Sequence, residues 1–283
     1  MSIIENNIDL SKLYDGSTEE YPIEIGYNLL QFTYDTDITY TNSEIIPKNI
    51  HFIWIGNPIS EKYVDTVMNC KKINSGYNVI LWVDYTSILE DDIKILYDNG
   101  VTVKNIYIDL ISGSANDVLK TYILQLLELN SNYGYKADII RLYVVYMEGG
   151  IYSDIDSVWL KPLDSNFDYE FVTYRIDKQC SNLTNSFFGF NKNSIIVSNL
   201  MKNLYLSINC FLKENNDRKF KAHIPVITGP NHLTLVIKNS NPQYLNYIHQ
   251  GYCVIGGPHE EIYNYFYKEN KSYCYQTFDK NWC

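Results

Sequence analysis

The chain has 283 residues, 46% of them hydrophobic and 20% charged, which is enough for one large α/β domain with a filled core. Its formal net charge is −10, with an isoelectric point of about 5.0, and the absence of a basic cluster argues against nucleic acid as a partner. No apolar stretch reaches the roughly 20 residues of a transmembrane segment, and the N-terminus lacks the pattern of a signal peptide or membrane anchor. These features predict a cytoplasmic protein.

Strands and helices are expected to alternate once the polar, acidic N-terminal extension over 1–44 has ended. The expected strands cover 49–56, 77–84, 103–109, 149–160, 169–174, 186–190, 224–228 and 252–257. The expected helices begin after an N-capping Ser60 and at a capping box formed by Ser114 and Asp117, cover 91–100, 136–150 and 194–213, and begin at Pro230 and Pro258. This order predicts a single α/β domain over 45–283, with a mostly parallel, doubly wound sheet and a smaller α+β C-terminal part.

Two absences narrow the function. The sequence contains neither G-x-G-x-x-G nor G-x-x-x-x-G-K-[ST], which disfavours a dehydrogenase and a P-loop NTPase. The six cysteines show no C-x-x-C spacing, so we expect free, mostly buried thiols and neither a zinc site nor a disulfide scaffold.

The stretch GGIYSDIDSVWL, residues 149–160, places Asp154 and Asp156 in a run that otherwise has the pattern of a strand. Residues two apart in a strand point the same way, so two like charges would share one face. A hard cation such as Mn²⁺ or Mg²⁺ would relieve that repulsion, and it would also bind the phosphates of a ligand. Two solvated acids at the end of a surface strand are the alternative.

Three further features point to a ligand site near this pair. Asp138 and Arg141 are three residues apart on the preceding helix and so share a face, although an exposed ion pair has the same spacing. Trp54 ends the first strand, where an aromatic face suits a nucleotide base, although it is equally consistent with the core. Asn185 stands at the start of another strand, where a turn or cap is also plausible.

The segments that carry these features are IPKNIHFIWIG, ADIIRLYVVYMEGGIYSDID, NSFFGFN and TGP (228–230). Together they resemble the DXD-motif sugar-binding glycosyltransferases, a family that includes yeast-type initiating mannosyltransferases and the glucosyltransferase domains of large clostridial toxins. The resemblance extends over about residues 45–230. It implies a GT-A fold, a nucleotide-sugar donor, Mn²⁺ or Mg²⁺, and retention of the anomeric configuration.

The resemblance also implies roles for individual residues. Those implied in catalysis are Asp138, Arg141 and Asp154, and the implied metal ligands are Asp154, Asp156 and Asp279. Those implied in donor binding are Ile53, Trp54, Ile55, Asp84, Asp138, Arg141, Tyr152, Asp154, Asn185 and Trp282. The tail departs from the family pattern, because YQTFDKNWC offers Asp279 as its one ionic candidate for a third metal ligand. We expect residues 276–283 to form a lid closed by Trp282 over the donor.

The leading hypothesis is thus a metal-dependent glycosyltransferase acting on an unknown glycan or protein acceptor. UDP-glucose is the first candidate donor, with UDP-galactose, UDP-N-acetylglucosamine and GDP-mannose also open. A nucleotide-sugar hydrolase or phosphodiesterase would use the same acids but would require a further acidic cluster for a second metal. A catalytically silent module that binds sugar or Ca²⁺ would not need the pair formed by Asp138 and Arg141.

Overall fold

The computed structural model describes part of the chain, namely residues 3–4, 32–33, 46–84, 86–112, 118–129, 131–163, 170–174, 183–214, 228–239, 254–256 and 273–277. The capping box at Ser114, the helix expected from Pro258, nearly all of the strand expected over 224–228, and the tail with Asp279 and Trp282 lie outside these residues. Within the N-terminal extension, β1 (Ile3–Ile4) pairs antiparallel with β2 (Phe32–Thr33).

A six-stranded sheet forms the centre of the fold, in the order β5-β4-β3-β6-β9-β8. The strands β3, β4, β5 and β6 run parallel, and β9 and β8 complete the sheet in antiparallel pairings. Their bounds are β3 (Asn49–Trp54), β4 (Asn78–Val83), β5 (Thr102–Asn105), β6 (Gly150–Ser153), β8 (Phe171–Tyr174) and β9 (Leu183–Phe190). The predicted alternation is therefore confirmed, and β6 lies where the parallel part of the sheet meets the antiparallel part.

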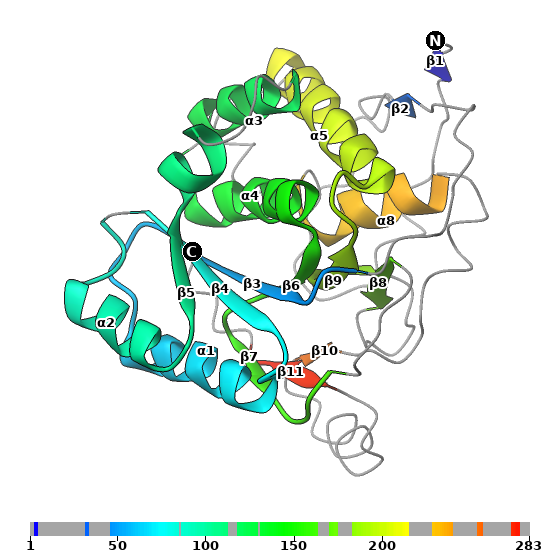
Figure 1. Cartoon of the computed structure of the whole chain (residues 1–283). Helices are drawn as coiled ribbons and strands as arrows, with labels where there is room; N and C mark the ends of the chain where they lie inside the picture. The colour runs from blue at the N-terminus through cyan, green and yellow to red at the C-terminus, as the bar shows by residue number, and fades with distance from the viewer. Residues whose placement is uncertain are drawn as a thin grey trace.

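Helices cover both faces of the sheet (Figure 1). One face carries α3 (Val118–Leu129), α4 (Tyr133–Glu148), α5 (Ile195–Glu214) and α8 (Pro230–Asn239). The other carries α1 (Glu61–Ile73), α2 (Glu90–Asp98) and a small sheet of β7 (Ser157–Trp159), β10 (Val254–Gly256) and β11 (Cys274–Gln276). Side chains alternate along each strand, so β3 sends Ile53 into one apolar core and Phe52 into the other.

The turn from α4 into β6 depends on its two glycines. Gly149 and Gly150 have φ values of 64° and 118°, which side chains with a Cβ rarely adopt. A Cβ on Gly150 would lie 2.7 Å from the Asn49 carbonyl oxygen, so the backbone of β3 also requires a glycine there. Helix α4 begins at the Asn132 cap, whose side chain accepts a hydrogen bond from the Tyr135 amide.

The strand expected over 103–109 is too long. Strand β5 ends at Asn105 and a π-helix, η3 (Ile106–Ser112), follows it. The Asn105 side chain accepts hydrogen bonds from the amides of Tyr107 and Ile108, both at 3.0 Å, and the Asp109 carboxylate accepts one from the Asn105 amide at 2.6 Å. These local bonds turn the chain away from the sheet.

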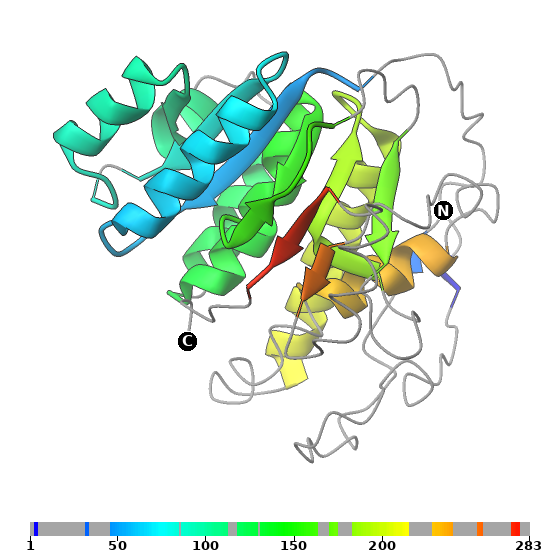
Figure 2. The same ribbon diagram turned by 90° about the horizontal axis from the view of Figure 1, so that it is seen from below.

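The prediction of one strand over 149–160 is also wrong. Strand β6 ends at Ser153, a turn holds Ile155 and Asp156, and β7 then joins the small sheet by pairing with β11. Figure 1 shows β7, β10 and β11 on the α1 side of the central sheet, and in Figure 2 β7 lies next to α1, followed by β11 and β10. The acids Asp154 and Asp156 therefore lie where the chain passes from one sheet to the other, and they do not share the face of a continuous strand.

Smaller expectations can also be compared with the structure. Ser60 occupies the N-cap position of α1, but its side chain makes no capping hydrogen bond. Cys70 and Cys274 are both buried, and neither is in a disulfide. Among the described residues, no helix is both long enough and apolar enough to cross a bilayer.

Candidate active site

Helix α4 places Asp138 and Arg141 on one buried face. They form an ion pair of 3.0 Å between Arg141 Nη2 and Asp138 Oδ1, and their side chains are 9% and 10% exposed. The expected sharing of a helical face is confirmed, and the surface ion pair considered as an alternative is excluded by this burial. Because a buried charge must be compensated, each side chain depends on the partners around it.

Arg141 joins α4 to the end of β6 and to β9. Its Nη1 atom lies 3.1 Å from Asp154 Oδ1 and donates to the Asn185 carbonyl oxygen at 2.6 Å. The guanidinium also lies over the Tyr152 ring, with its central carbon 4.7 Å from the ring centroid. One cation therefore connects two consecutive elements, α4 and β6, to β9, which only the fold brings next to them.

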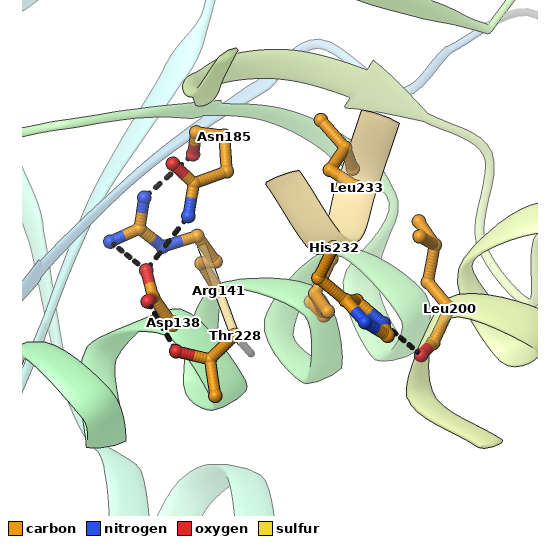
Figure 3. A pocket seen from close by; sticks show the side chains of 8 residues that line it. Asp138, Arg141, Asn185, Leu200, Thr228, His232 and Leu233 are labelled. Atoms are coloured by element: carbon orange, nitrogen blue, oxygen red, sulfur yellow. Dashed lines mark hydrogen bonds and ion pairs between the residues drawn. The ribbon is translucent and has the colours of Figure 1, made fainter. Parts of the chain in front are cut away.

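Asp138 has two further partners, Asn185 and Thr228 (Figure 3). Its carboxylate accepts hydrogen bonds from Asn185 Nδ2 at 2.8 Å and from Thr228 Oγ1 at 2.7 Å. Burial raises the pKa of Asp138 above its usual value, although Arg141 and the two hydrogen bonds oppose the shift. The network therefore holds a carboxylate in a site that is poorly solvated.

Asp154 is the most exposed member of the network, with 21% of its side chain accessible. Its Oδ1 atom accepts a hydrogen bond from the Tyr152 hydroxyl at 2.7 Å, and its Oδ2 atom accepts one from Gln276 Nε2 at 2.8 Å. Burial raises the pKa of Tyr152 well above its usual value, so the phenol stays protonated and remains a donor. The carboxylate is held in place from both sides while part of it still faces solvent.

The charge of Arg141 is stabilised by the acids around it. Burial by itself would lower the pKa of the guanidinium, but Asp154, with Tyr152, Asp138 and Asp156, raises it above its usual value. Arg141 is therefore a permanent cation beside the two acids of the D-x-D sequence, where negative charge on a ligand would be stabilised.

The residues around the D-x-D turn suit a hard divalent cation. Asp156 Oδ1 is a buried carboxylate oxygen, and burying a charged oxygen is costly unless positive charge compensates it. Mg²⁺ and Mn²⁺ prefer oxygen ligands, use one or two carboxylates, and leave their other positions to water and phosphate. Among the described residues no group of three or more histidine, cysteine or acidic side chains is arranged to hold a metal. Asp154 and Asp156 are therefore the two candidate metal ligands in the described part of the chain.

The residues expected around a nucleotide base lie at the same edge of the sheet, after β3 and β4. Asp84 Oδ2 accepts a hydrogen bond from the Gly56 amide at 3.0 Å. Trp54 is half-buried, donates from Nε1 to the Asn57 carbonyl oxygen at 2.7 Å, and packs on Tyr63 with a centroid separation of 4.9 Å. Ile53 is buried in the core beneath α4, and Ile55 packs against that core.

The structure thus brings together Asp138, Arg141, Tyr152, Asp154 and Asn185, as expected. It adds Gln276, which contacts Asp154, and Thr277. The backbone amide and the hydroxyl of Thr277 both donate to the Asp156 carbonyl oxygen, at 3.0 and 3.2 Å. Both residues lie within the lid expected over 276–283, but the sequence reasoning did not predict β11, which ends at Gln276. It also left Thr228 and His232 without a role, although the TGP sequence (228–230), which begins with Thr228 and ends two residues before His232, was the available signal.

Comparison with known proteins supports the same region. Residues 60–172 match the family described as "Glycosyltransferase sugar-binding region containing DXD motif". That segment contains Asp138, Arg141, Tyr152, Asp154 and Asp156, so the resemblance inferred from the sequence is confirmed for the part of the chain that carries the network.

Three curated relatives show how far the similarity extends. The chain is 36% identical over 121 residues to "Subversion of eukaryotic traffic protein A" of Legionella pneumophila, which is 41% of this chain and 18% of the relative. It is 26% identical over 174 residues to "Inositol phosphoceramide mannosyltransferase 3" of Schizosaccharomyces pombe, which is 60% of this chain and 40% of the relative. It is 24% identical over 165 residues to "Toxin A" of Clostridium novyi, 57% of this chain and 7% of the toxin. The chain therefore spans well under half of these relatives.

Solved structures establish the fold. The "PaToxG Glycosyltransferase" aligns with a TM-score of 0.55 and 24% identity, covering 72% of this chain and 74% of that one. The UDP-bound glycosyltransferase domain of the YGT toxin aligns with a TM-score of 0.54 and 11% identity, covering 73% of this chain and 79% of that one. The predicted GT-A fold is confirmed.

Proposed function

We propose that this chain, which carries the DXD sugar-binding region of glycosyltransferases in residues 60–172, transfers a hexose from a UDP-sugar to an acceptor. The observation that carries the proposal is the buried network in which Arg141 contacts both Asp138 and Asp154. A structural ion pair would need one acid, whereas this arrangement collects acids, a cation and hydrogen-bond donors at the C-terminal end of β6, where Asp154 is partly exposed.

The donor would lie along the edge of the sheet formed by the ends of β3, β4 and β6. The base would rest against Trp54, near Ile53, Ile55 and Asp84, and the sugar would lie by Asp138, Arg141 and Asn185. The half-exposure of Trp54 and the partial exposure of Asp154 support this placement. UDP is favoured because a solved domain of the same fold is described as UDP-bound, and UDP-glucose remains the first candidate.

The chemistry requires stabilisation of a departing diphosphate while the sugar gains positive charge. Arg141 supplies a fixed cation that no pH in the working range removes, which is the electrostatic contribution expected at such a site. Tyr152 and Gln276 keep the Asp154 carboxylate oriented, so little reorganisation is needed when the donor binds. When bound, a divalent ion such as Mn²⁺ would be held by Asp154 and Asp156 and would neutralise charge on the diphosphate.

The network disfavours a covalent intermediate on an enzyme carboxylate. Its described acids are already paired with Arg141, Asn185, Thr228, Tyr152 or Gln276, so they bind and orient rather than attack the sugar. The family resemblance implies retention of configuration, and without such an intermediate the acceptor hydroxyl would approach from the same side as the departing diphosphate. Nuclear magnetic resonance of the first-formed product would report its anomeric configuration.

The deciding experiment incubates the chain with UDP-glucose, UDP-galactose, UDP-N-acetylglucosamine and GDP-mannose, with Mn²⁺ or with chelator. Release of UDP or GDP is measured with and without a mixture of glycan and protein acceptors. A glycosyltransferase gives metal-dependent release that is faster with acceptor and labels the acceptor from a radioactive donor. Release that ignores acceptor would indicate a hydrolase, and binding without release would indicate a silent module. Either outcome would overturn the proposal.

A further inference from the structure

A small pocket, with room for a group about the size of one water molecule, lies beside the Arg141 network, between α4, β9, α5 and α8 (Figure 3). One wall is polar and includes Asp138, Arg141, Asn185 and Thr228, which the network already uses. The other wall consists of three leucines, Leu142, Leu200 and Leu233, together with one histidine. That histidine, His232 in the first turns of α8, has no role in the network.

His232 is almost fully buried, with 1% of its surface exposed. Its Nε2 atom lies 3.2 Å from the Leu200 carbonyl oxygen, which can only accept, so the proton is on Nε2 and Nδ1 carries a lone pair. Among the described residues, no hydrogen-bond partner reaches Nδ1. Burial lowers the pKa of His232 to about 4, so the ring is neutral and Nδ1 is an acceptor at physiological pH.

A buried acceptor without a partner destabilises the folded chain, because nothing replaces the water it loses. The cost is small only where a buried water, or a ligand group that displaces it, supplies the donor. The pocket that His232 lines is shared with Asp138, Arg141 and Asn185, which the proposed function assigns to the donor sugar. A hexose has hydroxyl groups on several carbons, and each is a donor of the kind that Nδ1 lacks.

We propose that His232 is a specificity-determining residue whose Nδ1 accepts a hydrogen bond from a hydroxyl or amide N–H group of the donor sugar. The inference rests on the proposed function and adds a residue to it. Asp138 accepts and Arg141 donates on one side of the sugar, and His232 provides an acceptor on the opposite, leucine-lined side. Sites that hydrogen-bond a substrate group reject analogues lacking it, because the buried polar atom is then left unpaired.

Two substitutions separate the two nitrogen atoms of the ring. In His232→Gln the amide nitrogen falls near the position of Nε2, so the bond to the Leu200 carbonyl is kept and the acceptor at Nδ1 is lost. In His232→Asn the amide oxygen falls near the position of Nδ1, so the acceptor is kept and the bond to Leu200 is lost. The pair therefore tests the role of Nδ1 against a purely structural role of the side chain.

Dissociation constants are measured by calorimetry for UDP and for the UDP-sugar that the wild type binds most tightly. We expect His232→Gln to weaken binding of the UDP-sugar by about 5- to 30-fold, as for a lost hydrogen bond, and to leave binding of UDP unchanged. His232→Asn should bind both as the wild type does, with a lower melting temperature. Equal effects of His232→Gln on UDP and UDP-sugar, or no effect on either, would overturn the inference.

A measurement on the wild-type protein tests the inference even if the two variants do not fold. In protein labelled with ¹⁵N-histidine, the Nδ1 resonance of His232 should move when the UDP-sugar binds and stay in place when UDP binds. Identical spectra in the two complexes would overturn the inference while leaving the proposed function intact. If the wild type binds neither UDP nor any of the four nucleotide sugars, the proposed function itself fails, and the inference fails with it.

Discussion

Arg141 Nη1 lies 3.1 Å from Asp154 Oδ1, an ion pair that ties helix α4 to the end of β6. Both residues come from one continuous stretch of sequence, but the helix and the strand run in different directions after the glycine pair, and only that reversal brings the two side chains together. The contact places a permanent positive charge beside the D-x-D acids.

Replacing Arg141 with lysine tests whether the guanidinium shape matters. Lysine keeps the charge, but it cannot contact Asp138, Asp154 and the Asn185 carbonyl at the same time as the planar fork does. We expect transfer to fall by about 100-fold, the scale seen when one electrostatic stabiliser is removed, in steady-state assays of UDP release.

Lys104→Arg is a suitable control for Arg141→Lys. Lys104, on β5, forms an ion pair with Glu148 of α4, but this pair is partly exposed and lies outside the network. Exposed pairs contribute about 0–1 kcal/mol, so the control should retain wild-type rates. If Arg141→Lys also retained them, Arg141 would be a structural residue only.

Asp156→Asn removes a charge from the D-x-D turn without changing its size. An amide is a weaker ligand for a hard cation than a carboxylate, so we expect the affinity for Mn²⁺ to fall by at least about tenfold and turnover to be abolished. Calorimetric titration with Mn²⁺ gives the first quantity. In the wild type, activity should disappear with chelator and return when Mn²⁺ is added.

Asp65→Asn, on the exposed surface of α1, controls for the general loss of one negative charge and should leave Mn²⁺ binding unchanged. Near-wild-type turnover of Asp156→Asn in metal-free buffer would contradict the proposed metal site.

Gln276 is expected to position Asp154, to which it donates a 2.8 Å hydrogen bond. Gln276→Leu leaves Asp154 Oδ2 without this donor, so the carboxylate should be less well ordered and the Mn²⁺ affinity should fall several-fold, as when the outer partner of a metal ligand is removed. Gln276→Glu should be more severe in stability, because it places a second carboxylate against Asp154. Melting temperatures and Mn²⁺ titrations of the two variants should show this order.

Gln276→Asn supplies the control, since it keeps an amide but shortens the side chain, and its Mn²⁺ affinity should lie between those of wild type and Gln276→Leu. Equal Mn²⁺ affinity in all four proteins would show that Gln276 does not act through Asp154.

Acid should destabilise the fold through its buried histidines. His51 Nδ1 accepts a hydrogen bond from Trp82 Nε1 at 3.1 Å, and Nε2 donates to the Gly149 carbonyl oxygen at 2.8 Å, so the neutral ring is fully satisfied. Burial lowers the pKa of His51 to about 4, from an ordinary value of 6.5. Between these values the unfolded chain binds more protons than the folded one. The stability contributed by neutral His51 is therefore complete above pH 6.5 and is lost as pH falls towards 4.

The loss reaches roughly 3 kcal/mol at the low end of that range, at 1.36 kcal/mol per pKa unit. Urea unfolding at pH 7.0 and pH 5.0 should show about 2 kcal/mol of this loss, from the 1.5 pH units between 6.5 and 5.0. His51→Gln should start from a lower stability and change less between the two pH values, because its side chain does not titrate. His232, whose pKa burial also lowers to about 4, contributes the same pH dependence to the wild type and to His51→Gln. An equal total pH dependence in the two proteins would contradict the role given to His51.

The sequence by itself determined the local features of the site. The pair Gly149–Gly150 ends α4 as predicted, because two positive φ angles act over neighbouring residues, whereas the helix begins after its Asn132 cap, three residues before the expected start at 136. The spacing of Asp138 and Arg141 then put both on one face of that helix. The parallel part of the sheet followed from alternating strands and helices, whose apolar periodicity is visible without knowledge of the fold.

Only the tertiary structure decided how these pieces meet. The turn at Asp156 sends β7 into a second sheet because β11 offers a pairing edge there, and β11 lies over 100 residues later in the chain. Gln276 and Asp154 are 122 residues apart and yet share a hydrogen bond, and Thr228 reaches Asp138 across 90 residues. Such contacts depend on which strands pair and which helices pack. That arrangement is decided by the packing energy of the whole core, which cannot be inferred from a local pattern of residue types.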